Sequence, residues 1–166
     1  MTQLFNLRST SERQGNYVAG FVDGEGSFYT SIRFIPDSKT KWRFSLNFAI
    51  GNNDKRVLEF CRAHLCCGNI RTVDSKKFLF EVSNLFLLDQ NIIPFFKQFQ
   101  FVSNKKRHEF RVFQLLVHFL KEETIDSMPK LTRFLYLRKL LSRHRSERSS
   151  YSDDFILKTF CPVAKS

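Results

Sequence analysis

The chain has 166 residues, of which 42% are hydrophobic and 20 are phenylalanine, so it is long enough and apolar enough to bury its own aromatic core. This composition excludes an intrinsically disordered chain, and no apolar run reaches the roughly 18 residues that a membrane span requires. Its 27 lysines and arginines outnumber its 16 acidic residues, and a formal charge of +11 is typical of a protein that binds a polyanion. Charge alone does not distinguish DNA, RNA, an anionic membrane or a merely basic protein.

Residues 16–25 are predicted to form a short helix with Asn16 as its N-cap and Gly26 just beyond its end. Period-two alternation then predicts a strand over 27–35 and a second strand over 42–50. The inward face of these strands is expected to carry large apolar side chains, namely Phe28, Ile32, Phe34, Phe44, Leu46, Phe48 and Ile50.

Asp54 is expected to cap a helix that runs to about Cys66, where Gly68 stops it. A second hairpin is predicted to pair residues 69–73 with residues 77–82. Further helices are expected from Asn84 to a point before Pro94, over 105–122 and over 130–143. The four cysteines, Cys61, Cys66, Cys67 and Cys161, contain no Cys-x-x-Cys pair, so no zinc site is expected.

The order αββαββα, followed by further helices, predicts an α+β fold in which a twisted four-stranded antiparallel sheet carries helices on one face only. We expect a single domain over 1–166, with a core over about 16–122 and a C-terminal helical extension over about 123–166. The arginine-rich stretch 142–150 is interpreted as a helix end and solvated linker. The uncovered sheet face is either an ordinary solvated face or a binding surface.

The segment from Tyr17 to Phe28, YVAGFVDGEGSF, resembles the signature helix of the LAGLIDADG homing endonucleases, and VAGFVDGEG matches it position by position with conservative replacements. The resemblance extends more loosely to the element order over about 16–120. It implies a site-specific endonuclease of the single-motif, homodimeric type, encoded in an intron or intein, that cuts both strands of a long pseudo-palindromic DNA site with Mg²⁺. Members of the family that bind intron RNA as maturases, or bind DNA without cutting it, keep a second reading open.

The resemblance also implies the active-site residues. The last acidic residue of the motif, here Glu25, is the metal ligand, and the carbonyl of the preceding Gly24 commonly joins it. Carboxylate and carbonyl oxygens are the ligands that Mg²⁺ prefers. Three further catalytic residues are implied at Asn52, Arg56 and Lys105. Their alternatives are a turn residue at 52, a helix-surface arginine at 56, and the adjacent Lys106 in place of Lys105.

Two glycines of the first helix predict a dimer interface. Gly20 and Gly24 are four residues apart and share one helix face, so that two such helices can approach closely. Since we detect only one copy of this helix in the chain, we expect an identical helix from a second subunit to cover it, giving a dimer of charge 2 × 11 = +22. Packing of the glycines inside one subunit is the alternative. Asp23 is expected to brace the helix end rather than bind metal.

The outward strand residues are expected to lie in the DNA major groove and contact base edges and phosphates. We assign this role to Tyr29, Ser31, Arg33, Arg43, Ser45, Asn47, Asn69, Arg71 and Lys77, and expect Val73 and Leu79 to touch thymine methyls. With no secretory leader evident, we expect an intracellular protein located with the DNA, in cytoplasm, nucleoid or organelle matrix.

Overall fold

The computed structural model describes residues 10–142 and 151–163. The stretch 143–150, predicted to be a solvated linker, therefore lies outside the described residues. The elements follow in the order α1 (Glu12–Glu25), β1 (Gly26–Phe34), β2 (Trp42–Asn52), α2 (Lys55–Leu65), β3 (Asn69–Asp74), β4 (Lys77–Val82), α3 (Leu85–Leu87), η1 (Leu88–Ile92), α4 (Ile93–Gln98), α5 (Asn104–Glu122), α6 (Met128–Ser142) and α7 (Asp153–Thr159).

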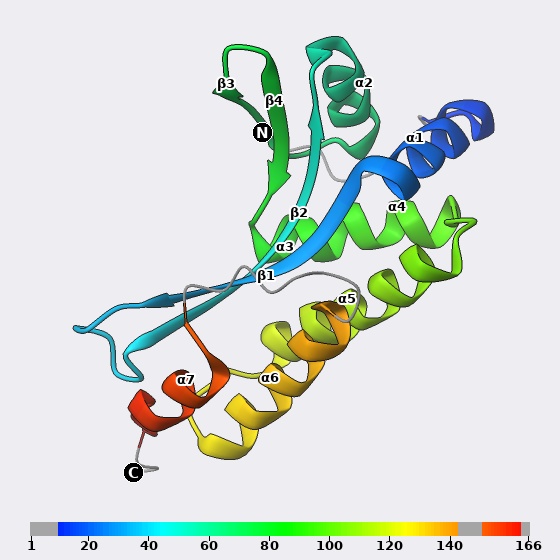
Figure 1. Cartoon of the computed structure of the whole chain (residues 1–166). Coiled ribbons are helices and arrows are strands. Elements are labelled where there is room, and N and C mark those ends of the chain that lie inside the picture. The colour runs from blue at the N-terminus through cyan, green and yellow to red at the C-terminus, as the bar shows by residue number, and fades with distance from the viewer. Residues whose placement is uncertain (1–9, 143–150, 164–166) are drawn as a thin grey trace.

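The four strands form one antiparallel sheet in the order β1-β2-β4-β3. The helices cover one side of it: Figure 1 shows the long β1–β2 ribbon crossing the molecule, with α4, α5 and α6 along one side. Phe28 pairs with Phe48 across the two strands, and both are buried against the helices. The predicted α+β fold, with helices on one face of a four-stranded sheet, is confirmed.

Helix α1 begins earlier than predicted. Its N-cap is Ser11, not Asn16, because Ser11 and Gln14 form a capping box: the Gln14 N–H donates to Ser11 Oγ, and the Ser11 N–H donates to Gln14 Oε1 at 3.2 Å. The extra turn brings Gly15 against Phe99, whose ring carbons would lie 2.3 Å from a Cβ at that position. The sequence pattern Ser-x-x-Gln was the signal for this start.

The helix predicted to end before Pro94 instead continues to Gln98, so that prediction is wrong. A π-helical segment, η1, ends at Ile92, and Pro94 then occupies the first turn of α4, a position that tolerates proline. Continuation buries Phe95 and Phe96. The buried Asn91 on this segment also donates to the Leu65 carbonyl at 3.2 Å, satisfying the end of α2.

Phenylalanine dominates the core. The ring of Phe28, which is 1% exposed, lies within 4.8–6.2 Å, centroid to centroid, of five other phenylalanine rings: Phe48, Phe96, Phe101, Phe110 and Phe113. These rings come from β1, β2, α4, α5 and the segment between α4 and α5. They tie α1's continuation, β1, to the helical layer.

The C-terminal extension packs on the β1–β2 hairpin. Helix α6 lies close to its predicted bounds, whereas α7 was not predicted. Trp42 lies edge-on to Tyr151, with the ring centroids 5.0 Å apart, and Arg138 on α6 pairs with Asp153 of α7 at 2.5 Å. Figure 1 shows α7 beside the tip of the ribbon. No helix among the described residues is long and apolar enough to cross a membrane.

Candidate active site and nucleic-acid interface

One face of α1 is open. Gly20 and Gly24 are both exposed, and a Cβ added to either would meet nothing within 4 Å. The opposite face of the helix is buried through Val18, Ala19 and Val22. Because neither glycine packs against its own subunit, the alternative that they serve local packing is wrong, and α1 presents an uncovered strip of small residues.

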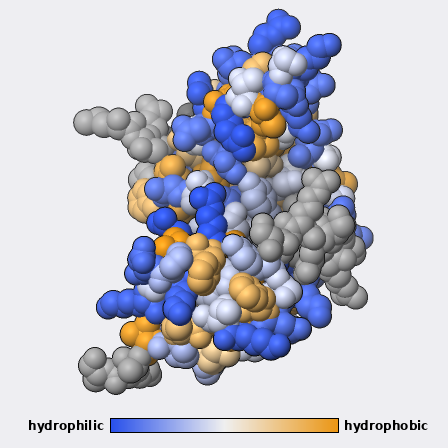
Figure 2. Space-filling view, turned by 60° about the vertical axis from the view of Figure 1, so that its left-hand side comes forward, coloured by the Kyte–Doolittle hydropathy of each residue, from blue (hydrophilic) through white to orange (hydrophobic). Residues whose placement is uncertain are grey.

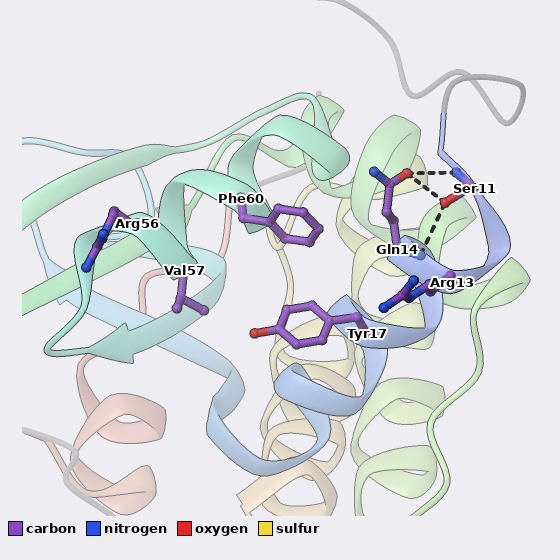
Figure 3. A pocket seen from close by; sticks show the side chains of 7 residues that line it. All are labelled: Ser11, Arg13, Gln14, Tyr17, Arg56, Val57 and Phe60. Carbon is purple, nitrogen blue, oxygen red and sulfur yellow. Dashed lines mark hydrogen bonds between the residues drawn. The ribbon is translucent and has the colours of Figure 1, made fainter.

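A pocket of about 700 Å³ lies beside this strip, between α1 and α2. Tyr17, 51% exposed, points from α1 toward Val57 and Phe60 on α2 (Figure 3). Its ring meets the Phe60 ring edge-on at 5.4 Å and stacks along α1 on Phe21 at 6.4 Å. An aromatic surface therefore extends the glycine strip toward the start of α1. The full lining is Ser11, Arg13, Gln14, Tyr17, Arg56, Val57 and Phe60.

Glu25 ends α1 and is exposed, and β1 begins at the next residue without a loop. The last turn of the helix has no basic residue, and the end of a helix dipole concentrates negative potential there. No described residue forms an ion pair or hydrogen bond with the Glu25 side chain. An exposed carboxylate, a hard oxygen donor, therefore ends the helix where its dipole is negative, and this fits a cation such as Mg²⁺.

One subunit alone does not complete a metal site. Within residues 10–142 and 151–163, no group of three or more His, Cys, Asp and Glu side chains converges. Since Mg²⁺ takes about six oxygen ligands and usually keeps several waters, the remaining ligands would come from water, nucleic acid or a second Glu25.

Asp23 braces the end of α1, as predicted. Its Oδ2 accepts the backbone N–H groups of Val102 and Ser103 at 2.9 and 2.8 Å, and its Oδ1 accepts the Ser103 hydroxyl. Burial, the largest single influence, raises the pKa of Asp23, but the hydrogen bonds from Ser103 and Val102 together outweigh it and lower that pKa below its usual value. The carboxylate is therefore ionised and committed to the start of α5.

The two candidate lysines have different environments. Lys106 is 4% exposed; its Nζ donates to the Gly26 carbonyl at 2.6 Å and to Glu109 Oε2 at 3.1 Å. Lys105 is exposed. Lys106 thus fixes the backbone next to Glu25 from within, and Lys105 is the lysine available to a phosphate. The Lys106–Glu109 spacing of three residues on a helix was a sequence signal for this internal pair.

Asn52 and Arg56 lie around the turn between β2 and α2. The Asn52 Oδ1 accepts the Asp54 N–H at 2.7 Å, so this oxygen serves the turn. The Arg56 side chain is 91% exposed and only loosely paired with Asp54, at 3.6 Å, and it lines the pocket beside α1. The turn role of Asn52 is visible in the structure; the catalytic roles of both residues stay predictions.

The sheet register places all nine predicted base-contacting residues on the outer face, because each alternates with a core residue or pairs with another member of the set. Arg33 lies directly opposite Arg43, and Arg71 and Lys77 are exposed. Facing arginines repel each other, so their pairing favours a surface that binds an anion. The surface seen in Figure 2 is mainly hydrophilic, with apolar patches between the hydrophilic residues.

Asn47 and Tyr29 do not project freely from this face. Asn47 is 6% exposed and donates its amide N–H to Ser31 Oγ at 3.0 Å, so the expectation of a solvent-facing Asn47 is wrong: neighbouring side chains cover it. The Tyr29 hydroxyl donates to Glu81 Oε1 at 2.5 Å. Nothing in the sequence indicated a contact between Tyr29 and Glu81, because the two residues lie two strands apart.

The α+β domain thus combines an open sheet face that carries exposed arginines with an exposed carboxylate at the end of a glycine-faced helix. A model of the LAGLIDADG endonuclease family matches residues 18–117, more than half of the chain. The protein therefore belongs to the LAGLIDADG endonuclease family.

Two fungal proteins are similar in sequence to part of this chain. The chain is 33% identical over 93 residues to "Probable intron-encoded DNA endonuclease 1" of Mycosarcoma maydis, which covers 55% of this chain and 33% of that protein. It is 28% identical over 131 residues to "Probable intron-encoded endonuclease 2" of Neurospora crassa, covering 76% of this chain and 29% of that protein. The chain thus spans about a third of the length of these relatives.

Solved structures share the fold. The archaeal intron-encoded homing endonuclease I-Vdi141I, complexed with DNA, superposes with a TM-score of 0.79 at 26% identity, covering 89% of this chain and 94% of that one. The I-LtrWI homing endonuclease bound to target DNA superposes at 0.75 and 28% identity, covering 82% and 47%. The group I intron-encoded I-CeuI superposes at 0.80 but at 17% identity, a likeness of fold alone, and covers 90% and 76%.

Proposed function

We propose that this chain is a homodimeric, intron- or intein-encoded homing endonuclease that hydrolyses both strands of a long pseudo-palindromic DNA site with Mg²⁺. The observation that carries the proposal is the open glycine strip of α1 ending in the exposed carboxylate of Glu25. Relatives named as intron-encoded endonucleases, and similar structures bound to DNA, support it. Such a protein would act in whichever compartment holds its target DNA.

The dimer follows from what α1 leaves uncovered. Apposition of two glycine strips lets the helix backbones approach closely, and the exposed Tyr17 beside the pocket adds aromatic area to the contact. A twofold axis between the helices then places two Glu25 carboxylates near each other. The symmetry matters for function, since two equivalent carboxylates match two strands to be cut.

In the cutting step Glu25, with the Gly24 carbonyl, would hold the metal at the end of α1. When bound, Mg²⁺ stabilises charge on the phosphate and on the leaving oxygen and lowers the pKa of a water. The residues of this chain orient that site. Lys106 fixes the Gly26 carbonyl, Asp23 ties the helix end to α5, and the exposed Lys105 and Arg56 are cations available to the backbone phosphates.

Recognition would use the outer sheet face in the major groove, one half-site per subunit. Arg33, Arg43, Arg71 and Lys77 supply charge, and the serines and Asn69 supply polar contacts. With ~6–10 phosphates neutralised, affinity should fall by about 10³–10⁵ between roughly 50 and 200 mM salt.

The test compares the wild-type protein with Glu25→Gln on a library of duplexes carrying intron insertion sites. We expect wild type to make double-strand cuts at one long site in Mg²⁺ and none in EDTA, and Glu25→Gln to bind that site in Ca²⁺ without cutting it. Glu12→Gln, a matched change of an exposed glutamate at the other end of α1, should cut normally. Unimpaired cutting by Glu25→Gln would remove residue 25 from its role; tight binding of intron RNA with no DNA cleavage would favour a maturase.

A further inference from the structure

The outer sheet face carries a carboxylate near its middle. Glu81 on β4 lies on the same face as Arg71, Arg43 and Arg33 and pairs in register with Asn69 on β3 and Ala49 on β2. A carboxylate there repels DNA phosphates unless a cation offsets its charge. The Glu81 side chain is 28% exposed, so it lies at the surface of this face and is partly covered by its neighbours.

Glu81 is the centre of a chain of contacts that crosses all four strands. From β1, the Tyr29 hydroxyl passes over β2 to donate to Glu81 Oε1 at 2.5 Å. On β2, Tyr29 pairs with Asn47 and Glu81 pairs with the small Ala49, so the contact crosses this strand diagonally. From β3, Arg71 Nε lies 4.0 Å from Glu81 Oε2. Each carboxylate oxygen therefore faces a different partner.

The two contacts differ in strength. Tyr29 is a firm anchor, because burial and the hydrogen bond to Glu81 raise the pKa of Tyr29 well above its ordinary value, and the phenol stays a donor at physiological pH. The Arg71 side chain is 59% exposed, and an ion pair this exposed and this long adds little to folding stability. What the pair indicates is direction: the guanidinium nitrogen that lies 4.0 Å from Glu81 Oε2 is Nε, so this contact does not use the two terminal nitrogens.

We propose that Glu81, anchored by Tyr29, is a positioning residue that aims the guanidinium of Arg71 at a guanine in each DNA half-site. The inference rests on the proposed function, since it names which base pair one residue of the DNA-binding face selects. An arginine fork donating to guanine O6 and N7 is the commonest specific contact in the major groove, and its geometry is strict. A guanidinium held from its Nε side reaches the base already oriented, and Glu81 also offsets part of the repulsion among the cations of the face.

A carboxylate offers a different way to read DNA, and it predicts a different base. Acceptor oxygens bind the amino groups of cytosine or adenine, not guanine O6 and N7. If Glu81 touched a base itself, its own variant would lose a preference for cytosine or adenine at a position that Arg71 variants leave unchanged.

The experiment selects the duplexes that each protein binds, in Ca²⁺, from a DNA library randomised over the half-site. The proteins compared are the wild-type chain, Glu81→Gln, Tyr29→Phe, Arg71→Lys and the double variant Glu81→Gln with Arg71→Lys. Wild type should enrich guanine at one position per half-site by about 5- to 150-fold over other bases, the range expected for one bidentate contact. Glu81→Gln and Tyr29→Phe should reduce enrichment there and at no other position. Arg71→Lys should lose it, and the double variant should lose no more.

Arg33→Lys is the matched control, because Arg33 is an exposed arginine on the same face that forms no ion pair with any described residue. Combined with Glu81→Gln, its effects should add. Thermal unfolding of each variant separates a folding defect from a change in specificity. The inference is overturned if Glu81→Gln weakens binding equally to all sequences, leaves the guanine preference intact, or removes a cytosine or adenine preference. If wild type enriches no sequence at all, the proposed function fails first, and this inference with it.

Discussion

Replacing Gly20 with alanine should stabilise the subunit and weaken the dimer. In the isolated subunit the new Cβ meets nothing within 4 Å, so no steric cost opposes it. Alanine is favoured over glycine in a helix interior by about 0.8–1.0 kcal/mol. For a chain of this size, that gain corresponds to a rise in Tm of about 2–4 °C.

The dimer should respond in the opposite direction. A methyl group placed between two closely packed helices costs about 1–3 kcal/mol, and twofold symmetry introduces two of them, so about 2–6 kcal/mol in total. The dimer Kd should therefore rise about 30-fold to 10⁴-fold. Gly20→Leu should separate the subunits fully while the helix still forms.

The assay measures two quantities for each variant. Sedimentation equilibrium over a range of concentrations gives the dimer Kd, and thermal unfolding at a concentration where the subunits are separate gives the stability of the fold. Gly15→Ala is the control on the same helix: its Cβ would lie 2.3 Å from the Phe99 ring, so it should lower Tm. A Gly20→Ala protein that dimerises like wild type, or unfolds at a lower temperature as a monomer, would refute the assignment of this face.

Two further predictions concern the supports around Glu25. Lys106→Met removes the cation that pairs with Glu109, whose side chain is 1% exposed, and should lower the free energy of unfolding in denaturant by about 3–5 kcal/mol. Joint replacement of Lys106 by Met and Glu109 by Leu should recover most of that loss. A Lys106→Met protein within about 1 kcal/mol of wild type, the scale of an exposed ion pair, would contradict the internal role of Lys106. The pKa of Asp23 is lowered in the folded protein, so its ionised carboxylate contributes stability above the ordinary pKa of 3.8, and this contribution is lost as pH falls through the lower folded pKa. Wild type should therefore unfold at a higher temperature than Asp23→Asn at neutral pH, and the two proteins should converge in acid. A difference that persists at low pH would show that the hydrogen bonds from Ser103 do not depend on ionisation of Asp23.

The local elements followed from patterns that sequence alone displays. Alternation of apolar residues on β1 and β2 predicted which side chains face the core, and this is confirmed for Phe28 and Phe48. It is wrong for Phe34 at the end of β1, which is 39% exposed. The motif around Gly20 and Gly24 indicated the family and an open helix face, and both are observed. These features are local in sequence, since strand periodicity and helix spacing depend on residues two to four positions apart.

The errors arose where distant packing outweighed a local rule. Pro94 predicted a helix end, but burial of Phe95 and Phe96 with a π-helical turn before the proline continues the helix. The missed helix α7 is short, and it is held by contacts outside its own segment, with Trp42 far away in the chain and with Arg138 on α6. Neither contact has a signature in the segment itself.

The sequence by itself determined the family, the order of the strands and of the helices before α7, the side of the sheet that faces solvent and the helix that carries Glu25. Only the tertiary structure decided which residues on that side are free. It showed that Asn47 is covered, that Lys106 is buried at Gly26, and that Tyr29 meets Glu81 across an intervening strand. The physical reason is the sequence distance over which each property is decided. Strand and helix periodicity sets the direction of a side chain from residues two to four positions away. Its hydrogen-bond partner depends on tertiary packing, which brings together Tyr29 and Glu81, 52 positions apart, and Lys106 and Gly26, 80 positions apart.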